Sequence, residues 1–77
     1  MNFSEALQRI KDGKYMARSG WNGKNCYVHL ERPMILEPPF DAPIRKPYLE
    51  MRDSRGDFLP WTPSHSDLLA DDWAEVG

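Results

Sequence analysis

The sequence predicts an α+β fold, in which an N-terminal helix packs on a small, twisted antiparallel sheet and a short helical turn precedes the last strand. Three observations support this prediction. The first twelve residues show helical apolar periodicity with a capping signal at each end. The segments that follow alternate apolar and polar residues, and turn-forming residues separate them. The chain of 77 residues has the length of one domain, which we assign to residues 1–77.

The helix is expected over residues 2–12. Asn2 can cap its first turn, and Glu5, three positions later, completes a capping-box pattern. Gly13 follows at the left-handed position that commonly ends a helix. A helix of this length is not stable alone in water, so we expect it to dock on the sheet or on a partner. Its apolar face consists of Phe3, Ala6, Leu7 and Ile10.

Two strands are expected next, over residues 14–18 and 25–30, joined by a turn at Asn22-Gly23. Asn-Gly is the strongest short signal for a tight hairpin, because both residues tolerate positive φ. Strand periodicity turns one face of each strand toward a core. In the second strand, Cys26, Val28 and Leu30 share one face, and Tyr27 and His29 share the other.

A proline-rich excursion between strands is expected over residues 31–44. Four prolines fall between Pro33 and Pro43, and because proline lacks a backbone N–H, a regular ladder is not expected there. The apolar residues of this excursion are expected to pack on something, such as a neighbouring subunit. They are Met34, Ile35, Leu36 and Phe40.

The third and fourth strands are predicted over residues 45–53 and 58–61, with a polar, glycine-containing hairpin loop at 53–57. Pro60 marks the fourth strand as an edge strand or a strand end.

A helical turn is expected at residues 65–70, because Ser64 can cap it and Asp67 lies where a capping-box acid belongs. The last strand is expected over residues 71–76. Apolar character assigns Leu68, Leu69 and Trp73 to the core.

Charge and composition exclude several classes of partner. The formal net charge is −2, with acids and bases mixed along the chain, so no bulk nucleic-acid binding is expected. One small anionic ligand is compatible with this charge. No apolar run approaches the ~20 residues of a membrane span, and the N-terminus does not resemble a signal peptide, so we expect no membrane partner and a cytoplasmic location. Cys26 is the only cysteine, and no spacing of Cys and His fits a metal, so no metal or cofactor is expected.

The small size of the chain favours a homo-oligomer. A domain of this length buries only about 60% of its unfolded surface and is marginal alone. Three Trp, three Tyr and three Phe are a heavy aromatic load for 77 residues, and such residues supply either a core or an interface. A well-packed monomer remains the alternative.

The stretch from Arg18 to Lys24 displays an arginine, a tryptophan and a lysine around one bend. Trp21 at this bend is either an anchor in an interface or a stacking platform for a flat ligand. Asn22 is explained by the turn alone, although a turn amide beside Gly23 can also approach a ligand closely.

Several motifs occur in fixed order, with the most specific ones at the two ends of the chain. They are Asn2-Phe3-x-Glu5-Ala6-Leu7, Gly13, Arg18-x-Gly20-Trp21-Asn22-Gly23-Lys24 and Trp61-Thr62-Pro63-Ser64-x-x-Asp67-Leu68-Leu69-Ala70-x-Asp72-Trp73. This pattern resembles the small phage and prophage proteins of the Thoeris anti-defence 2 family. The resemblance implies a protein that binds glycocyclic ADP-ribose, and in some members cyclic dinucleotides, without cleaving them. It also implies a homotetramer with ligand pockets between subunits.

The candidate ligand-binding residues have side chains that suit such a ligand. Trp21 and Trp61 are expected to stack on a base, and Arg18 to grip a phosphate. Thr62 and Asp67 offer polar edges to the ligand, and Asn22 a turn amide. For Asp67 the capping role is an equal alternative.

No catalytic function is expected. Enzyme chemistry needs a nucleophile, a base and an orienting group, and no such spacing occurs around His29, His65 or Cys26. The alternative function is a phage adaptor that binds a host protein through exposed Trp and Arg residues and the proline-rich excursion.

Overall fold

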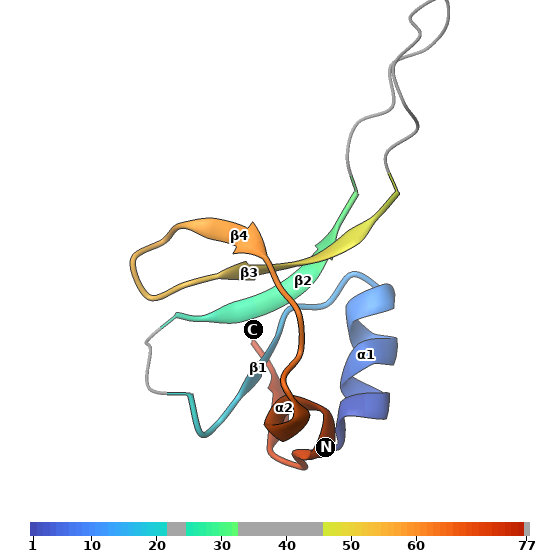
Figure 1. Ribbon diagram of the computed structural model, residues 1–77. Coiled ribbons are helices and arrows are strands. Elements are labelled where there is room, and N and C mark those ends of the chain that lie inside the picture. The colour runs from blue at the N-terminus through green and yellow to red at the C-terminus, as the bar shows by residue number, and fades with distance from the viewer. Residues whose placement is uncertain (22–24, 33–45, 77) are drawn as a thin grey trace, which may run out of the picture.

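The computed structural model describes residues 1–21, 25–32 and 46–76. The predicted turn at Asn22-Gly23 and most of the predicted excursion at 31–44 lie outside these residues. Within them, the chain forms an α+β fold with an N-terminal helix, an antiparallel sheet and a short helix before the last strand (Figure 1). The predicted fold class is therefore confirmed.

The N-terminal helix, α1 (Phe3–Lys11), begins and ends where the capping signals predict. Asn2 Oδ1 accepts a hydrogen bond from the Glu5 amide at 2.9 Å, which is the Asn2 half of the predicted capping box. Gly13 has a φ of +92°, a left-handed conformation that glycine adopts without a steric penalty.

Five strands form one sheet in the order β4-β3-β2-β1-β5, and every neighbouring pair is antiparallel. The first four form the predicted meander, and the last strand returns alongside the first (Figure 1). Pro60 ends an edge strand, as predicted. The strands are β1 (Met16–Arg18), β2 (Tyr27–Glu31), β3 (Tyr48–Arg52), β4 (Phe58–Pro60) and β5 (Trp73–Glu75).

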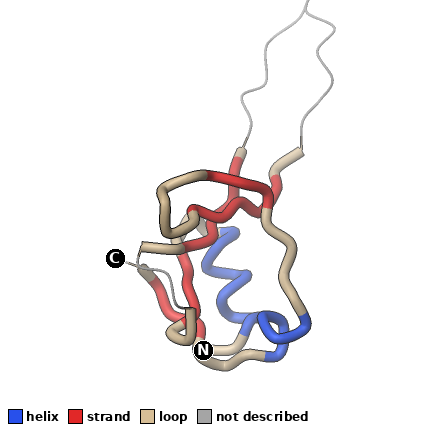
Figure 2. Tube along the Cα trace, turned by 60° about the vertical axis from the view of Figure 1, so that its left-hand side comes forward, coloured by secondary structure: helices blue, strands red, loops and turns tan. Residues whose placement is uncertain are grey.

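The core lies where α1 packs on one face of the sheet, against β1, β2 and β5 (Figure 2). Met16 and Val28 are partners in the β1–β2 register, and both are fully buried. The predicted inward face of the second strand is thus confirmed through Val28. The buried apolar residues are Phe3, Ala6, Ile10, Met16, Val28 and Trp73.

The second helix, α2 (His65–Leu69), has the predicted capping box. The Ser64 amide donates to Asp67 Oδ2 at 2.9 Å, and the Asp67 amide donates to Ser64 Oγ at 3.2 Å. The prediction that Leu68 and Leu69 belong to the core is wrong, because they are 45% and 86% exposed. This short helix packs against α1 at one end of the molecule, and the residue that it buries is Asp67.

The first two strands have other bounds than predicted. The predicted strands at 14–18 and 25–30 are observed as Met16–Arg18 and Tyr27–Glu31. After β1, the Ser19 amide donates to the Asp72 carbonyl at 3.1 Å, and the Gly20 amide donates to Asp72 Oδ2 at 3.1 Å. These amides therefore bind the segment before β5, which removes them from any ladder with β2.

The first residue of the chain pairs with β5. The Met1 ammonium donates to the Trp73 carbonyl at 2.8 Å, and the Trp73 amide donates to the Met1 carbonyl at 3.1 Å. Met1 thus bonds to β5 on the side away from β1. The short strand β5 is therefore held by hydrogen bonds on both sides.

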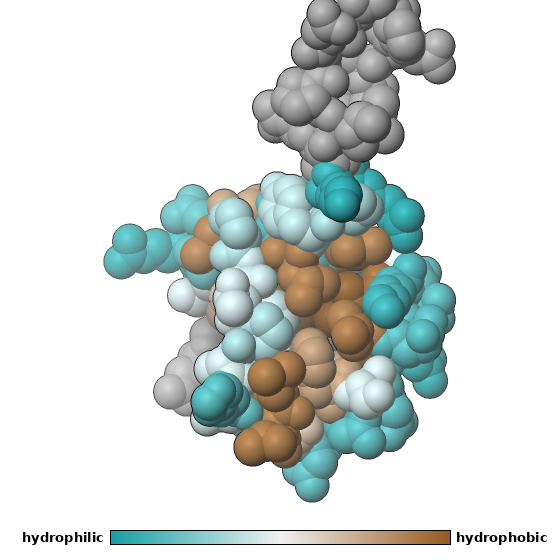
Figure 3. Space-filling model, turned by 45° about the vertical axis from the view of Figure 1, so that its right-hand side comes forward, coloured by the Kyte–Doolittle hydropathy of each residue, from teal (hydrophilic) through white to brown (hydrophobic). Residues whose placement is uncertain are grey.

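The surface of the described part carries several exposed apolar side chains. Figure 3, which turns the α1 side of Figure 1 forward, shows a face on which hydrophobic side chains gather between polar ones. No helix among the described residues has the length and apolar character needed to cross a membrane. The large exposed apolar residues are Tyr15, Tyr48, Phe58, Leu59, Leu68, Leu69 and Val76.

Candidate functional site

Arg18, at the end of β1, bridges two carboxylates that the chain reaches some fifty residues later. Its Nε donates to Asp72 Oδ1 at 2.9 Å, and its Nη1 donates to Asp67 Oδ1 at 3.0 Å. The geometry follows from the sheet, because Arg18 pairs with Trp73 across β1 and β5. Asp72 and α2 therefore lie beside it. Charge-assisted hydrogen bonds of this kind are about twice as strong as neutral ones.

Asp72 also organises the bend that begins after β1. Its Oδ2 accepts from the Gly20 amide at 3.1 Å and from Ser19 Oγ at 3.3 Å. The Trp21 amide then donates to the Arg18 carbonyl at 3.2 Å. One carboxylate thus fixes both the guanidinium of Arg18 and the backbone that leads to Trp21.

These contacts shift the pKa values of the three charged groups. The hydrogen bond from Arg18 is the largest influence on Asp72, and it holds the pKa of that carboxyl below its usual value. Partial burial acts to raise the pKa of Asp67, but hydrogen bonds from Ser64 and Arg18 outweigh it and the pKa is lowered. The hydrogen bond to Asp72, and then that to Asp67, raises the pKa of Arg18 above its ordinary value. All three groups are therefore charged together at neutral pH.

The folded protein is expected to lose stability in acid through these two carboxylates. Because their pKa values are lowered on folding, the unfolded chain binds more protons, so their contribution is complete above the unfolded pKa of about 3.9 and is lost as pH falls through the folded values. Urea unfolding between neutral pH and strong acid should show this loss. It should be smaller in Asp72→Asn, whereas Asp71→Asn, at an exposed neighbour, should keep it. If wild type and Asp72→Asn lose the same unfolding free energy between neutral pH and acid, Asp72 does not contribute to the acid sensitivity, which would contradict this prediction.

Three tryptophans and a phenylalanine form one aromatic cluster beside this bridge. Trp73 is buried, and its Nε1 donates to the Asp67 carbonyl at 3.0 Å. Trp21 contacts Trp73 edge-on with ring centroids 5.4 Å apart, and it contacts Trp61 edge-on at 6.3 Å. Phe3 of α1 completes the cluster through tilted contacts with Trp61 and Trp73. Trp21 and Trp61 are only half-buried, so part of each ring lies at the surface.

The structure brings most of the predicted ligand-binding residues to this corner. Trp21 and Trp61 contact each other, and Arg18 and Asp67 form an ion pair. Thr62 is exposed next to Trp61. Asn22 lies outside the described residues.

Asp67 is the predicted contact with the least capacity left for a ligand. It is 8% exposed, and its two oxygens accept from Arg18 and from the amide and hydroxyl of Ser64. This arrangement favours the capping role over direct ligand contact. Among the described residues, the bonds from Arg18 to carboxylates use Nε and Nη1 and not Nη2.

Two features of the site were not predicted from the sequence. From the sequence alone Asp72 has no role of its own, whereas the structure makes it a direct partner of Arg18. The β1–β5 register would have indicated this contact, because it places Asp72 beside Arg18. That register can be written down only when the last strand is known to pair with the first. The other feature is a group of polar side chains on the opposite face of the sheet.

On that opposite face, an open pocket of about 460 Å³ lies away from α1. His29 Nε2 lies 2.9 Å from Glu50 Oε1 within it. These residues face one another because His29 and Glu50 are direct partners in the β2–β3 register. The pocket is lined by Tyr15, Tyr27, His29, Glu31, Tyr48, Glu50 and Phe58.

Comparison with known proteins identifies the family. The Thoeris anti-defense 2-like domain matches residues 1–76. A protein of Bacillus phage SP01, "Thoeris anti-defense 2", is 33% identical over 81 aligned positions, which cover 95% of this chain and 91% of the phage protein. The family match over residues 1–76 includes both tryptophan-bearing motifs, the Arg18 bridge and the aromatic cluster. The chain belongs to the Thoeris anti-defense 2-like family.

Proposed function

We propose that this protein is a phage anti-defence protein that binds a cyclic ADP-ribose-type signal, glycocyclic ADP-ribose, and sequesters it without cleaving it. Family membership over residues 1–76 is the observation that supports this proposal most strongly. The protein acts in the cytoplasm of the infected bacterium, where it lowers the free concentration of the signal. Some of its binding capacity extends to cyclic dinucleotides.

The half-buried tryptophans supply the stacking surface for the adenine base. Trp21 and Trp61 lie edge-on to each other at an interplanar angle of 72°, so their faces point in different directions. A base can stack on one face and contact the edge of the other ring. Base–aromatic stacking contributes ~1–3 kcal/mol per base.

Arg18 supplies the charge for the phosphates. Its two ion pairs fix the guanidinium plane, so little side-chain entropy is lost when the remaining N–H groups bind an anion. The two aspartates leave this bridge with one excess negative charge, so one arginine alone does not attract a diphosphate. A second cation is needed, and a neighbouring subunit can provide it.

A homotetramer with pockets between subunits meets this need. The exposed side chain of Leu69 and its neighbour Leu68 project from α2, close to the aspartate that binds Arg18. Covering them would remove apolar surface from water, which favours association. Subunit contact at this end of the molecule would also enclose the ligand and exclude water from it.

Sequestration requires affinity but no turnover, so the proposal assigns no catalytic residue. Such a protein counteracts a signal in proportion to its own amount, and each pocket stays occupied after binding. Its effectiveness therefore depends on slow release of the ligand.

Calorimetric titration against a ligand panel tests the proposal. The panel contains cyclic ADP-ribose isomers, cyclic dinucleotides, ADP-ribose and NAD. We expect tight binding of one cyclic member, with fewer than one ligand per chain because subunits share a pocket. No binding across the panel would contradict the proposal and favour an adaptor that binds a host protein through Leu68, Leu69 and the exposed aromatic residues.

A further inference from the structure

We propose that the face of the sheet opposite α1 carries a site for a divalent transition-metal ion, with His29, Glu31 and Glu50 as ligands. This inference goes beyond the proposed nucleotide binding and does not depend on it. The spacing of Cys and His along the sequence predicted no metal site. The three residues come together through strand pairing instead.

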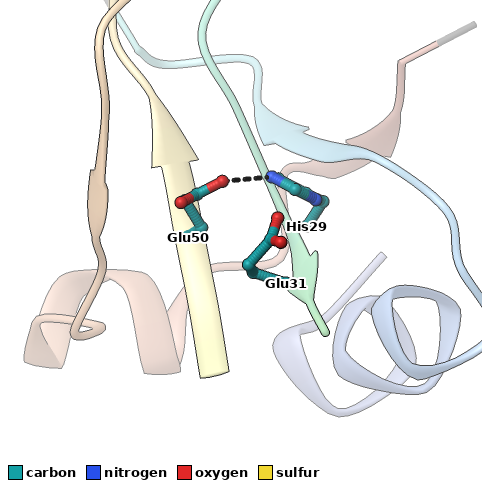
Figure 4. Close-up of side chains that lie close together, drawn as sticks. All are labelled: His29, Glu31 and Glu50. Carbon is teal, nitrogen blue, oxygen red and sulfur yellow. Dashed lines mark hydrogen bonds and ion pairs between the residues drawn. The ribbon is translucent and has the colours of Figure 1, made fainter. Parts of the chain in front are cut away.

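The sheet places the three side chains on one face. His29 and Glu31 are two positions apart on β2, so both point away from the core that Val28 faces. Glu50 lies directly opposite His29 on β3. Figure 4 shows the imidazole and the two carboxylates turned toward one another.

The distances suit a common ion. The nearest ligand atoms of the three side chains all lie within 4.8 Å of one another, and His29 Nε2 is 2.9 Å from Glu50 Oε1. Zinc bonds to nitrogen and oxygen of about 2.0–2.2 Å place adjacent ligand atoms of a tetrahedral site about 3.3–3.6 Å apart. The His29–Glu50 pair, at 2.9 Å, needs to open by only about half an ångström to reach this separation, and rotation of the Glu31 side chain brings in the third ligand.

The charge of the group favours a cation. Two carboxylates share the site, and among the described residues no lysine or arginine forms an ion pair with either of them. The side chains of His29 and Glu50 are only 15% and 14% exposed, so water screens the negative charge of Glu50 incompletely. A dication would offset the repulsion between the carboxylates.

The surroundings hold the imidazole in position. The rings of Tyr15 and Phe58 meet the His29 ring nearly at right angles, with centroids 5.4 and 6.2 Å away. Tyr48 Oη donates to Glu50 Oε2 at 3.4 Å, and such outer contacts orient metal ligands. The pocket, about 460 Å³ in volume, leaves open coordination positions for water or an anionic group.

The ligand set indicates which ions fit. One imidazole nitrogen with two carboxylates suits zinc better than calcium or magnesium, which prefer oxygen ligands alone. Zinc also binds such sites more tightly than manganese or ferrous iron. We therefore assign the site to Zn²⁺, with three protein ligands and an open position.

Titration of the protein with zinc chloride tests this assignment. Wild type should bind one zinc ion per chain, and zinc should raise its thermal unfolding temperature. His29→Gln and Glu31→Gln should each weaken binding by more than the roughly 10–100-fold that follows loss of an outer-shell partner. Cobalt added in place of zinc should give a visible absorption spectrum in wild type that both variants lose.

Two variants serve as controls for other zinc ligands. His65→Gln removes the exposed histidine of α2, and Cys26→Ser removes the thiol next to β2. Both should bind zinc as wild type does. Glu31→Gln keeps the size of a side chain that lies on the face away from the core, so this variant should fold. It therefore tests the zinc site even if His29→Gln folds poorly.

Unchanged zinc affinity in Glu31→Gln would overturn the assignment. So would failure of wild type to bind zinc at about 1 mM, a concentration that corresponds to only ~4 kcal/mol of binding free energy. In either case His29 and Glu50 form a hydrogen-bonded pair and no metal site.

Discussion

Nucleotide binding should fall sharply when Trp21 is replaced by alanine. Loss of a stacking interaction worth ~1–3 kcal/mol raises the dissociation constant roughly 5–150-fold. Trp21 is half-buried and touches Trp61 and Trp73 through ring edges, so its removal leaves Trp73 in place under Phe3. Calorimetry with the cyclic ligand measures the change in affinity, and light scattering measures the oligomer.

Two outcomes distinguish stacking from an interface role for Trp21. Trp21→Phe keeps an aromatic face and should recover part of the affinity, while both variants should keep the oligomeric mass of wild type. If Trp21→Ala instead dissociates the subunits, Trp21 is an interface anchor and the loss of binding is indirect.

The largest loss of folding stability should come from Trp73→Ala. Trp73 is 2% exposed, and its indole N–H satisfies the Asp67 carbonyl. Truncating a buried tryptophan costs about 3–5 kcal/mol, which is a large part of the total of roughly 4–12 kcal/mol for a chain of this length. Urea unfolding, read by circular dichroism, should show a variant that is partly or wholly unfolded without denaturant.

The comparison variants separate packing from the hydrogen bond. Trp73→Phe keeps a ring in the core but removes the indole donor, so its cost should be smaller. Leu69→Ala truncates an apolar side chain that is 86% exposed and should change the monomer's stability by less than about 0.5 kcal/mol. Equal losses in Trp73→Ala and Leu69→Ala would contradict this description of the core.

Local signals in the sequence predicted the elements well. Asn2 and Gly13 mark the two ends of α1, and Ser64 and Asp67 cap α2. These helix ends could be predicted because capping involves residues only a few positions apart. The alternation through Val28 predicted the buried face of β2 for the same reason. The assignment of Leu68 and Leu69 to the core failed because hydrophobicity alone does not say which side of a five-residue helix meets another element.

Contacts between distant segments could not be predicted in this way. The bridge from Arg18 to Asp72 and the pairing of His29 with Glu50 both depend on strand register. A shift of one residue in register moves every side chain to the other face. The proline-rich stretch separates β2 from β3, so no turn motif near these strands specifies how they align. The location of the candidate sites therefore required the structure.

Recovery of the signal after binding is the most direct test of whether the protein sequesters it without cleaving it. The protein, in excess, is mixed with glycocyclic ADP-ribose and filtered, and the retained fraction is then denatured by heat and analysed by mass spectrometry. If the protein sequesters the signal, the filtrate should contain none of it. Denaturation of the retained protein should then release all of the signal unchanged. Signal that passes freely through the filter, or that is recovered as a breakdown product, would contradict sequestration.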